Sequence, residues 1–248
     1  MPEPDSSAPI ALVTGAGRRL GRAVSLGLAH VGFDIAIHYQ QSADDAVTLA
    51  EQIRTIKRRA WTFPADLEQQ GDAARLIARV TESAGPVAAL INNASIYPED
   101  RLLDMAEEAL LQNIRVNAWA PFVLGRAVAA QGRPASVINF LDTRMRDYDA
   151  RHVSYHLSKR MLFSLTRMMA LEFAPAVRVN AIAPGLVLPP PGKDDAYLQD
   201  LAPTNPLNAH GDASDIVRSV LFLLESPFIT GQVIYVDGGR HMLGGLYD

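Results

Sequence analysis

Short apolar runs alternate with longer amphipathic stretches along the chain. We expect strands at residues 10–13, 34–38, 61–65, 89–92, 136–140, 178–182 and 233–236, and helices at residues 20–31, 44–58, 72–83, 110–130, 152–173 and 214–224. Near-continuous apolar strands separated by helices are typical of a parallel sheet that is buried on both faces. The pattern therefore predicts an α/β protein with helices on both sides of a central sheet.

Chain length and connectivity favour a single domain over residues 1–248. Right-handed crossovers between the expected strands give a doubly wound Rossmann fold, a seven-stranded parallel sheet with its ligand cleft at the carboxyl ends of the strands. Residues 184–206 are rich in proline and glycine and form the one irregular region. This segment is either a lid over the cleft or a floppy surface loop, and its exit from the sheet favours a substrate lid.

Composition excludes several classes of function. The net charge of −4 and the pI of about 5.9 argue against nucleic-acid and anionic-membrane partners. The absence of cysteine excludes disulfides, thiolate metal sites and a cysteine nucleophile, and the histidines form no spaced cluster, so we expect no metal. No apolar stretch has the length of a membrane span, and the polar first residues contain no cationic segment before an apolar one. We expect a cytoplasmic protein.

The first strand runs directly into a glycine-rich turn at residues 14–21 and then into a helix. Glycines let backbone N–H groups approach a pyrophosphate, and the helix N-terminus adds partial positive charge. Any tight turn favours glycine, but this position after the first strand favours dinucleotide binding. We expect cofactor contacts from Gly15, Arg18, Arg19, Leu20 and Gly21.

The second strand indicates which dinucleotide is bound. NAD sites usually place an acid after this strand to bind the ribose 2′-hydroxyl, but Asp34 opens the strand and Asp44 and Asp45 fit the start of the next helix. The strand ends instead in cofactor-binding candidates without a carboxylate, His38, Tyr39 and Gln40. A missing acid together with Arg18 indicates a 2′-phosphate, so we expect NADP(H).

Three residues are candidates for proton transfer. Tyr155 and Lys159 share one face of the expected helix because they lie four residues apart, and Asp142 directly follows a buried strand. We expect the ammonium of Lys159 to lower the pKa of Tyr155 from about 10. Asp142 has an alternative role, as a turn cap or a partner of Arg144 or Arg146. The presence of Tyr155, Lys159 and Arg19 in the same expected site favours a catalytic role for Asp142.

In these motifs the chain resembles the short-chain dehydrogenase/reductase family over nearly its whole length. The matching segments follow the family's order, at residues 14–21, 66–67, 92–95, 117, 155–159, 184–185 and 229–239. The resemblance implies contacts along the cofactor from adenine to nicotinamide, made by Asp66, Leu67, Asn93, Ala94, Ser95, Pro184 and Gly185. It also implies that Lys159 holds the nicotinamide ribose, that Asn117 orders a water behind the lysine, and that the protein is a homotetramer.

Departures from the common family pattern narrow the resemblance. Arg19 replaces the middle glycine of the turn, Asp142 stands about where the catalytic serine lies, and Ser95 replaces a glycine. These changes resemble the pteridine reductase branch, which includes dihydromonapterin and alternative dihydrofolate reductases. That branch also has the His38–Tyr39 pair, but usually follows it with a basic residue where this chain has Gln40.

The substitution suits the reduction of a pterin. A C=N bond needs a proton on nitrogen as hydride reaches carbon, and a carboxyl group is able to donate it or to orient a water that does. We therefore expect an NADPH-dependent reductase of a pterin or folate-like small molecule, with substrate contacts from Arg19, Ser95, Tyr97, Asp142 and Tyr155. The alternatives are a 3-oxoacyl or ketone reductase of the same family and a non-catalytic dinucleotide-binding protein.

Overall fold

The computed structural model describes residues 8–69, 71–243 and 246–247. The first seven residues, on which the expected absence of a secretory signal partly depends, lie outside this range. None of the helices in the described ranges is long and apolar enough to cross a membrane.

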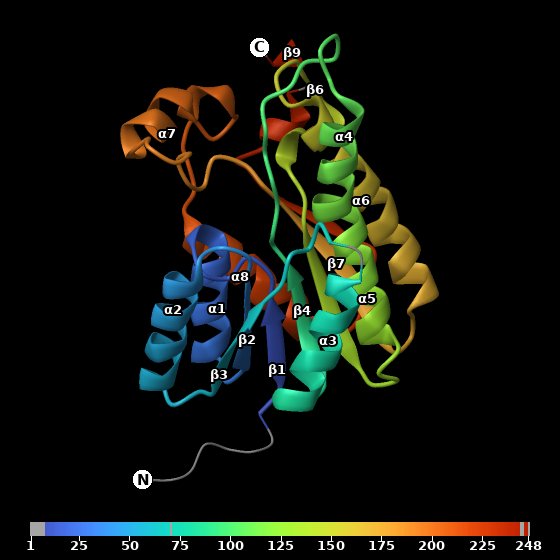
Figure 1. The fold of residues 1–248 in the computed structure, drawn as a ribbon. Coiled ribbons are helices and arrows are strands. Elements are labelled where there is room, and N and C mark those ends of the chain that lie inside the picture. The colour runs from blue at the N-terminus through green and yellow to red at the C-terminus, as the bar shows by residue number, and fades with distance from the viewer. Residues whose placement is uncertain (1–7, 70, 244–245, 248) are drawn as a thin grey trace.

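A seven-stranded parallel sheet forms the centre of the molecule, in the order β3-β2-β1-β4-β5-β7-β8 (Figure 1). The strands are β1 Ile10–Val13, β2 Asp34–Tyr39, β3 Ala60–Pro64, β4 Val87–Asn92, β5 Ala135–Phe140, β7 Val177–Pro184 and β8 Val233–Val236. The α/β class and the doubly wound Rossmann fold are confirmed. The strand order reverses between β1 and β4, so the carboxyl ends of these two strands diverge around a crevice.

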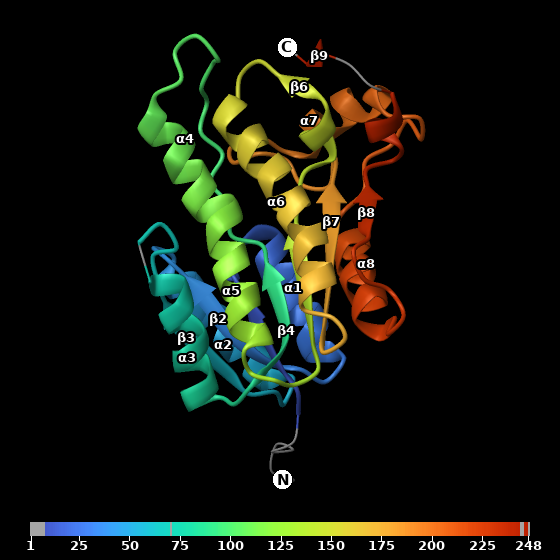
Figure 2. The same ribbon diagram turned by 90° about the vertical axis from the view of Figure 1, so that its right-hand side faces the viewer.

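Helices cover both faces of the sheet (Figures 1 and 2). They are α1 Arg19–His30, α2 Ala43–Thr55, α3 Asp72–Ser83, α4 Glu107–Ile114, α5 Ala120–Ala129, α6 Val153–Glu172, α7 Asp195–Leu201 and α8 Ala213–Glu225. Side chains of a strand alternate between its faces. Accordingly, Ala11 and Val13 of β1 pack with α1, α2 and α8, and Ile10 and Leu12 pack with α3, α5 and α6.

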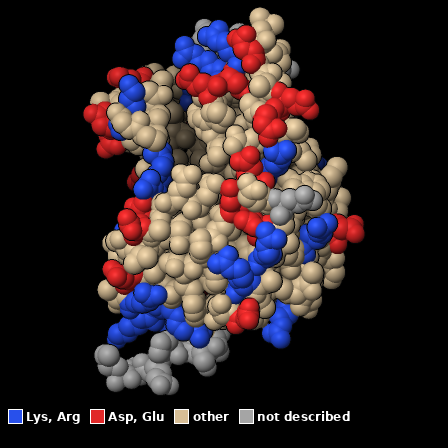
Figure 3. All heavy atoms as spheres, viewed as in Figure 1, with Lys and Arg blue, Asp and Glu red and all other residues tan. Residues whose placement is uncertain are grey.

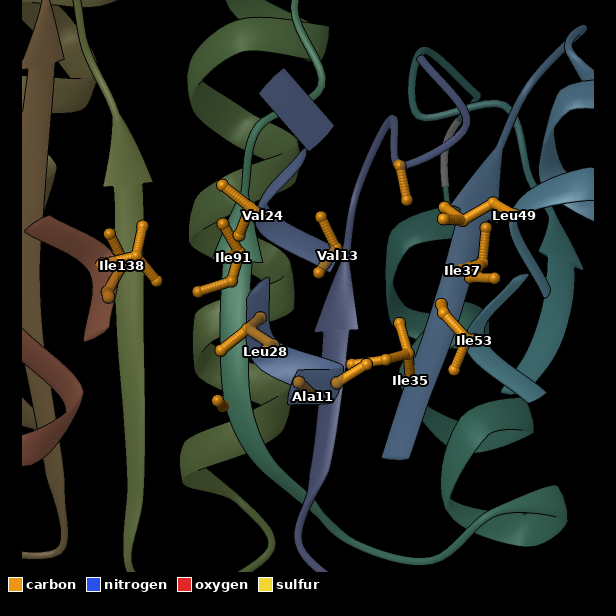
Figure 4. Packing of buried hydrophobic residues seen from close by; sticks show 14 of the residues in the cluster. Ala11, Val13, Val24, Leu28, Ile35, Ile37, Leu49, Ile53, Ile91 and Ile138 are labelled. Atoms are coloured by element: carbon orange, nitrogen blue, oxygen red, sulfur yellow. The ribbon is translucent and has the colours of Figure 1, made fainter. Parts of the chain in front are cut away.

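The first of these two apolar layers holds the glycine-rich turn rigidly over the sheet. Figure 4 shows Val24 and Leu28 of α1 beside Val13 and Ile91. Val13 is the last residue of β1, and Ile91 is the last but one of β4. All four side chains are almost completely buried. The start of α1 is thereby fixed relative to the carboxyl ends of β1 and β4.

The structure differs from the sequence pattern in three segments. The helix expected at 110–130 begins earlier, at α4, and is interrupted by a π-helical turn, Arg115–Trp119, before α5. The irregular segment 184–206 contains the short helix α7, whose seven residues are too few to show a periodic pattern. A small parallel pair, β6 Tyr148–Asp149 with β9 Leu246–Tyr247, brings the segment before α6 next to the residues near the C-terminus.

Candidate active site

A cavity of about 590 Å³ opens at the carboxyl ends of the central strands. Its wall includes most of the residues that the sequence singled out: Gly15, Arg18, Arg19, Leu20, Asn93, Ala94, Ser95, Tyr97, Asp142, Tyr155, Lys159, Pro184 and Gly185. Val187, Leu188, Pro190 and Pro191 close it from the loop side. Part of the segment expected to be a lid therefore lines the cavity, and its action as a lid stays a prediction.

The glycine-rich turn is built for close backbone approach. Gly15 has a φ of 60°, a left-handed conformation that favours glycine. A Cβ on Gly21 would lie 2.7 Å from the Nδ2 atom of Asn93, so a larger residue has no room. That amide donates hydrogen bonds to the carbonyl oxygens of Thr14 (2.9 Å) and Gly15 (3.1 Å). The turn and the end of β4 thus form one rigid unit at the N-terminus of α1, as a pyrophosphate site requires.

His38 supports this turn from behind. Its Nδ1 accepts a hydrogen bond from the backbone N–H of Gly15 (3.1 Å), and its Nε2 lies 3.1 Å from the carbonyl oxygen of Ala65, to which it donates in the matching tautomer. Burial lowers the pKa of His38 to about 4, so the ring is neutral at physiological pH. We expected His38 among the cofactor-binding residues, but the structure places it under the turn and off the cavity wall.

The two arginines of the turn point in different directions. Arg18 pairs with the carboxylate of Asp45 at the start of α2, and both side chains are exposed. Arg19 has a φ of 52°, and its Nη2 donates to the carbonyl oxygen of Pro189 (2.8 Å) in the loop that covers the cavity. Arg18 therefore lies on the side of the turn near β2, while Arg19 links the turn to the lid.

Asp34 does not serve the ribose. Its buried carboxylate, at the start of β2, accepts from the backbone N–H of Arg59 (2.8 Å) and from the guanidinium of the same residue. At the other end of the strand, Gln40 donates to Asp66 (2.9 Å), and Leu67 is buried in the core. The end of β2 carries no carboxylate of its own, but Asp66 lies close to it through its hydrogen bond with Gln40.

Asp142 has two separate interactions. Its Oδ2 accepts a hydrogen bond from the hydroxyl of Tyr155 (3.0 Å), and its Oδ1 accepts from the backbone N–H of Arg144 (2.7 Å) at the start of a 3₁₀ turn, Thr143–Arg146. The sequence presented a turn cap and a catalytic role as alternatives, and in the structure the cap coexists with the contact to Tyr155; the catalytic role stays a prediction. The nearest hydroxyl, on Thr143, instead donates to buried Asp237.

The electrostatics of the pair differ from the expectation. Burial, and next the adjacent Asp142 carboxylate, raise the pKa of Tyr155 well above 10. Lys159 does not offset this, because its Nζ donates to the carbonyl oxygen of Phe140 (2.7 Å) and lies 5.6 Å from the centre of the tyrosine ring. The prediction that Lys159 lowers the pKa of Tyr155 is therefore wrong: in this structure the pKa is raised. Burial also lowers the pKa of Lys159, to about 8.

Asn117 lies in the π-helical turn between α4 and α5. Its Nδ2 contacts the carbonyl oxygen of Ile96 (3.0 Å), Asn113 Oδ1 (3.1 Å) and Ser158 Oγ (3.0 Å), and its Oδ1 accepts from the backbone N–H of Ile96 (2.9 Å). The side chain thereby ties the segment after β4 to α6, next to Lys159. Its role in ordering a water stays a prediction.

Tyr97 forms an aromatic edge at the cavity mouth. Its ring meets that of Tyr155 edge-on, with centroids 4.5 Å apart, and stacks on His152 at 3.8 Å. The hydroxyl accepts from Arg144 Nη2 (3.0 Å). The sequence indicated Tyr97 as a substrate contact but did not indicate a contact with His152. His152 buttresses Tyr97, and nothing in the spacing of the two residues signals this contact.

Comparison with known proteins agrees with this arrangement. A family model described as enoyl-(acyl carrier protein) reductase matches residues 15–241. The chain belongs to the short-chain dehydrogenase/reductase family. A 3-oxoacyl-[acyl-carrier-protein] reductase of Staphylococcus epidermidis is 30% identical over 240 residues, covering 94% of this chain and 98% of the relative. The sequence resemblance to this family of oxidoreductases is confirmed.

Two solved structures of this family are also similar. FolM alternative dihydrofolate reductase 1 from Brucella canis, complexed with NADP, has a TM-score of 0.89 and 33% identity, covering 94% of each chain. The Brucella suis protein, also in complex with NADP, has the same score and identity and covers 96% of each chain. The resemblance to the alternative dihydrofolate reductase branch is thus confirmed at the level of structure.

Proposed function

We propose that this short-chain dehydrogenase/reductase is an NADPH-dependent reductase of a dihydropterin-type substrate, such as dihydrobiopterin, dihydromonapterin or dihydrofolate. The observation that carries the proposal is the contact of the Asp142 carboxylate with the Tyr155 hydroxyl, at 3.0 Å. Supporting evidence is the similarity to the Brucella FolM proteins, which are named alternative dihydrofolate reductases.

The Asp142 carboxylate is better suited to a C=N bond than to a carbonyl. Reduction of a carbonyl develops negative charge on oxygen, which a neighbouring carboxylate would repel. Reduction of a C=N bond places a proton on nitrogen, and the carboxylate is able to accept from the N–H edge of a pterin. Tyr155 is protonated at physiological pH and its hydroxyl faces the Asp142 carboxylate, so the phenol is in the form that donates a proton, while its raised pKa makes it a weaker acid than an exposed tyrosine.

NADPH is the proposed cofactor because the residues around the cavity fit it. The glycine turn at the start of α1 leaves space for a pyrophosphate. Arg18 lies beside this turn, next to α2, and supplies a cation for a 2′-phosphate bound there. Bound NADPH supplies the hydride. Lys159 would hold the nicotinamide ribose, and Pro184 and Gly185, which also line the cavity, would border the amide. The family resemblance adds Asp66 and Leu67 beside the adenine, although neither lines the cavity.

A homotetramer is part of the same proposal. Met168 and Leu171 of α6 are 63% and 84% exposed, and Trp119, in the turn before α5, is 49% exposed. Large apolar side chains on these two helices favour a covering subunit.

A 3-oxoacyl reductase is the second candidate, favoured by the Staphylococcus epidermidis relative. A substrate panel separates the two functions. Purified protein with NADPH should oxidise the cofactor when given dihydrobiopterin, dihydromonapterin or dihydrofolate, and only slowly with an acetoacetyl thioester. The reverse preference would contradict the pterin proposal.

A further inference from the structure

A second hollow, which we call the outer chamber, adjoins the catalytic cavity and has a volume of about 710 Å³. The two spaces share six lining residues, Tyr97, Asp142, Pro184, Gly185, Leu188 and Pro190. Figure 3 shows this face of the molecule hollowed between the arm that carries α7 and the main body. A ligand with its reacting ring against Tyr155 therefore has room to extend past Tyr97.

The outer chamber is rich in cationic side chains from separate parts of the chain. Arg144 comes from the 3₁₀ turn after β5, Arg151 from the residues before α6, and Arg240 from the 3₁₀ turn Arg240–Met242 after β8. The acids on its wall are Glu99 and Asp142. One oxygen of Asp142 already accepts from Tyr155 and the other from the backbone of Arg144.

The guanidinium of Arg144 is held in place within the chain. Arg144 donates to the hydroxyl of Tyr97 (3.0 Å), and all three arginines take part in further interactions inside the protein. A guanidinium has five N–H donors in a fixed fork, so it is able to bind a ligand carboxylate while keeping an internal partner. Positioned arginines also lose little conformational entropy when such a ligand binds.

Apolar side chains also line the outer chamber. They are Leu198 and Leu201 of α7 together with Leu186 and the ring of Tyr197. A chamber lined by both apolar side chains and arginines fits a flat, apolar linker that ends in acidic groups. It gives no advantage to a short side chain that carries only hydroxyl groups.

We propose that the outer chamber binds an anionic extension of the substrate, an aromatic linker with terminal carboxylates, which makes this enzyme selective for folate-like over short-chain pterins. The inference rests on the proposed function and specifies its substrate class. Arg144 and Arg151 are the residues assigned to the carboxylates.

The test compares dihydrofolate with dihydrobiopterin in the variant Arg151→Gln. Loss of one carboxylate contact should lower kcat/KM for dihydrofolate by about tenfold, mainly through KM. The value for dihydrobiopterin, which has a neutral side chain, should change by less than about twofold. Equal effects on both substrates, or no effect on either, would overturn the proposal.

Arg133→Gln is the matched control. This exposed residue lies in the turn before β5, at the amino end of the strands, and the variant makes the same change in net charge. It should leave both substrates unaffected. If it matches Arg151→Gln, the effect is one of overall charge and the proposal fails.

A measurement without turnover separates this inference from the proposed function. We expect p-aminobenzoyl-glutamate to bind the NADPH-loaded protein in calorimetry, its uncharged diester to bind more weakly, and Arg151→Gln to remove the difference. Equal binding of diacid and diester overturns the chamber proposal even if pterins are reduced. A protein that reduces only acetoacetyl coenzyme A, yet still prefers the diacid, refutes the pterin function and retains an anion-binding chamber.

Discussion

The ion pair between Arg18 and Asp45 makes the cofactor assignment testable. If a 2′-phosphate binds Arg18, it competes with the Asp45 carboxylate for the same guanidinium. Arg18→Gln should therefore weaken NADPH binding and leave NADH nearly unaffected. Asp45→Asn should strengthen NADPH binding, because it removes both the competitor and a negative charge near the phosphate.

The exposure of the two residues sets the size of each effect. A hydrogen bond to a charged group contributes about 1.5–3 kcal/mol. Since the Arg18 side chain is 69% exposed, we expect the lower end of that range, or about a tenfold loss of affinity for NADPH. An exposed ion pair is worth about 0.2–1 kcal/mol, so Asp45→Asn should tighten NADPH binding by roughly 1.5–5-fold.

Fluorescence titration of both reduced cofactors measures these affinities. Arg22→Gln is the control, because Arg22 makes a similar contact to α2, with Gln52 (2.7 Å), but does not line the cavity. In the double variant of Arg18 and Asp45, the gain from Asp45→Asn should largely disappear. Equal losses for NADPH and NADH in Arg18→Gln would refute the 2′-phosphate assignment.

Three further predictions concern catalysis and stability. Tyr155→Phe should lower kcat by about 10²–10⁴-fold with little change in NADPH affinity, and an unchanged kcat would exclude the phenol as proton donor. Asp142→Ser should lower kcat/KM for pterins by about 100-fold and raise turnover of acetoacetyl thioesters; parallel changes would contradict its role in substrate choice. Acid should destabilise the fold through His38: the unfolded ring takes up a proton near pH 6.5 but the folded ring only near pH 4. Up to about 3 kcal/mol of stability is therefore lost between these values. Urea unfolding at both pH values measures the loss, and His38→Asn should reduce it.

The fold was largely predictable because strand burial leaves a direct trace in the sequence. The run at residues 10–13 is apolar at every position since both faces of β1 are covered, and the structure gives the same bounds. The π-helical turn around Asn117 left no such trace. In the structure Asn117 of this turn contacts Ile96 and Ser158, which are distant in the sequence, and no local pattern reveals such contacts.

The sequence predicted many of the residues that line the cavity but not their electrostatics. The spacing of Tyr155 and Lys159 placed both on one helix face, and both line the cavity. Their pKa values depend on burial and on which acceptor is nearest, and sequence separation reveals neither. The sequence likewise predicted that His38 contacts the cofactor, whereas its ring contacts Gly15 and Ala65, and sequence separation does not reveal these partners.

Arg19 shows how the needs of folding and of the active site conflict at one position. A residue other than glycine in the left-handed region costs roughly 1 kcal/mol, and Arg19 adopts a φ of 52° there. Its side chain offsets part of this cost by holding the carbonyl oxygen of Pro189. Selection for thermal stability alone would favour glycine at position 19, so a directed-evolution experiment for heat resistance should enrich a change that loosens the lid and impairs turnover.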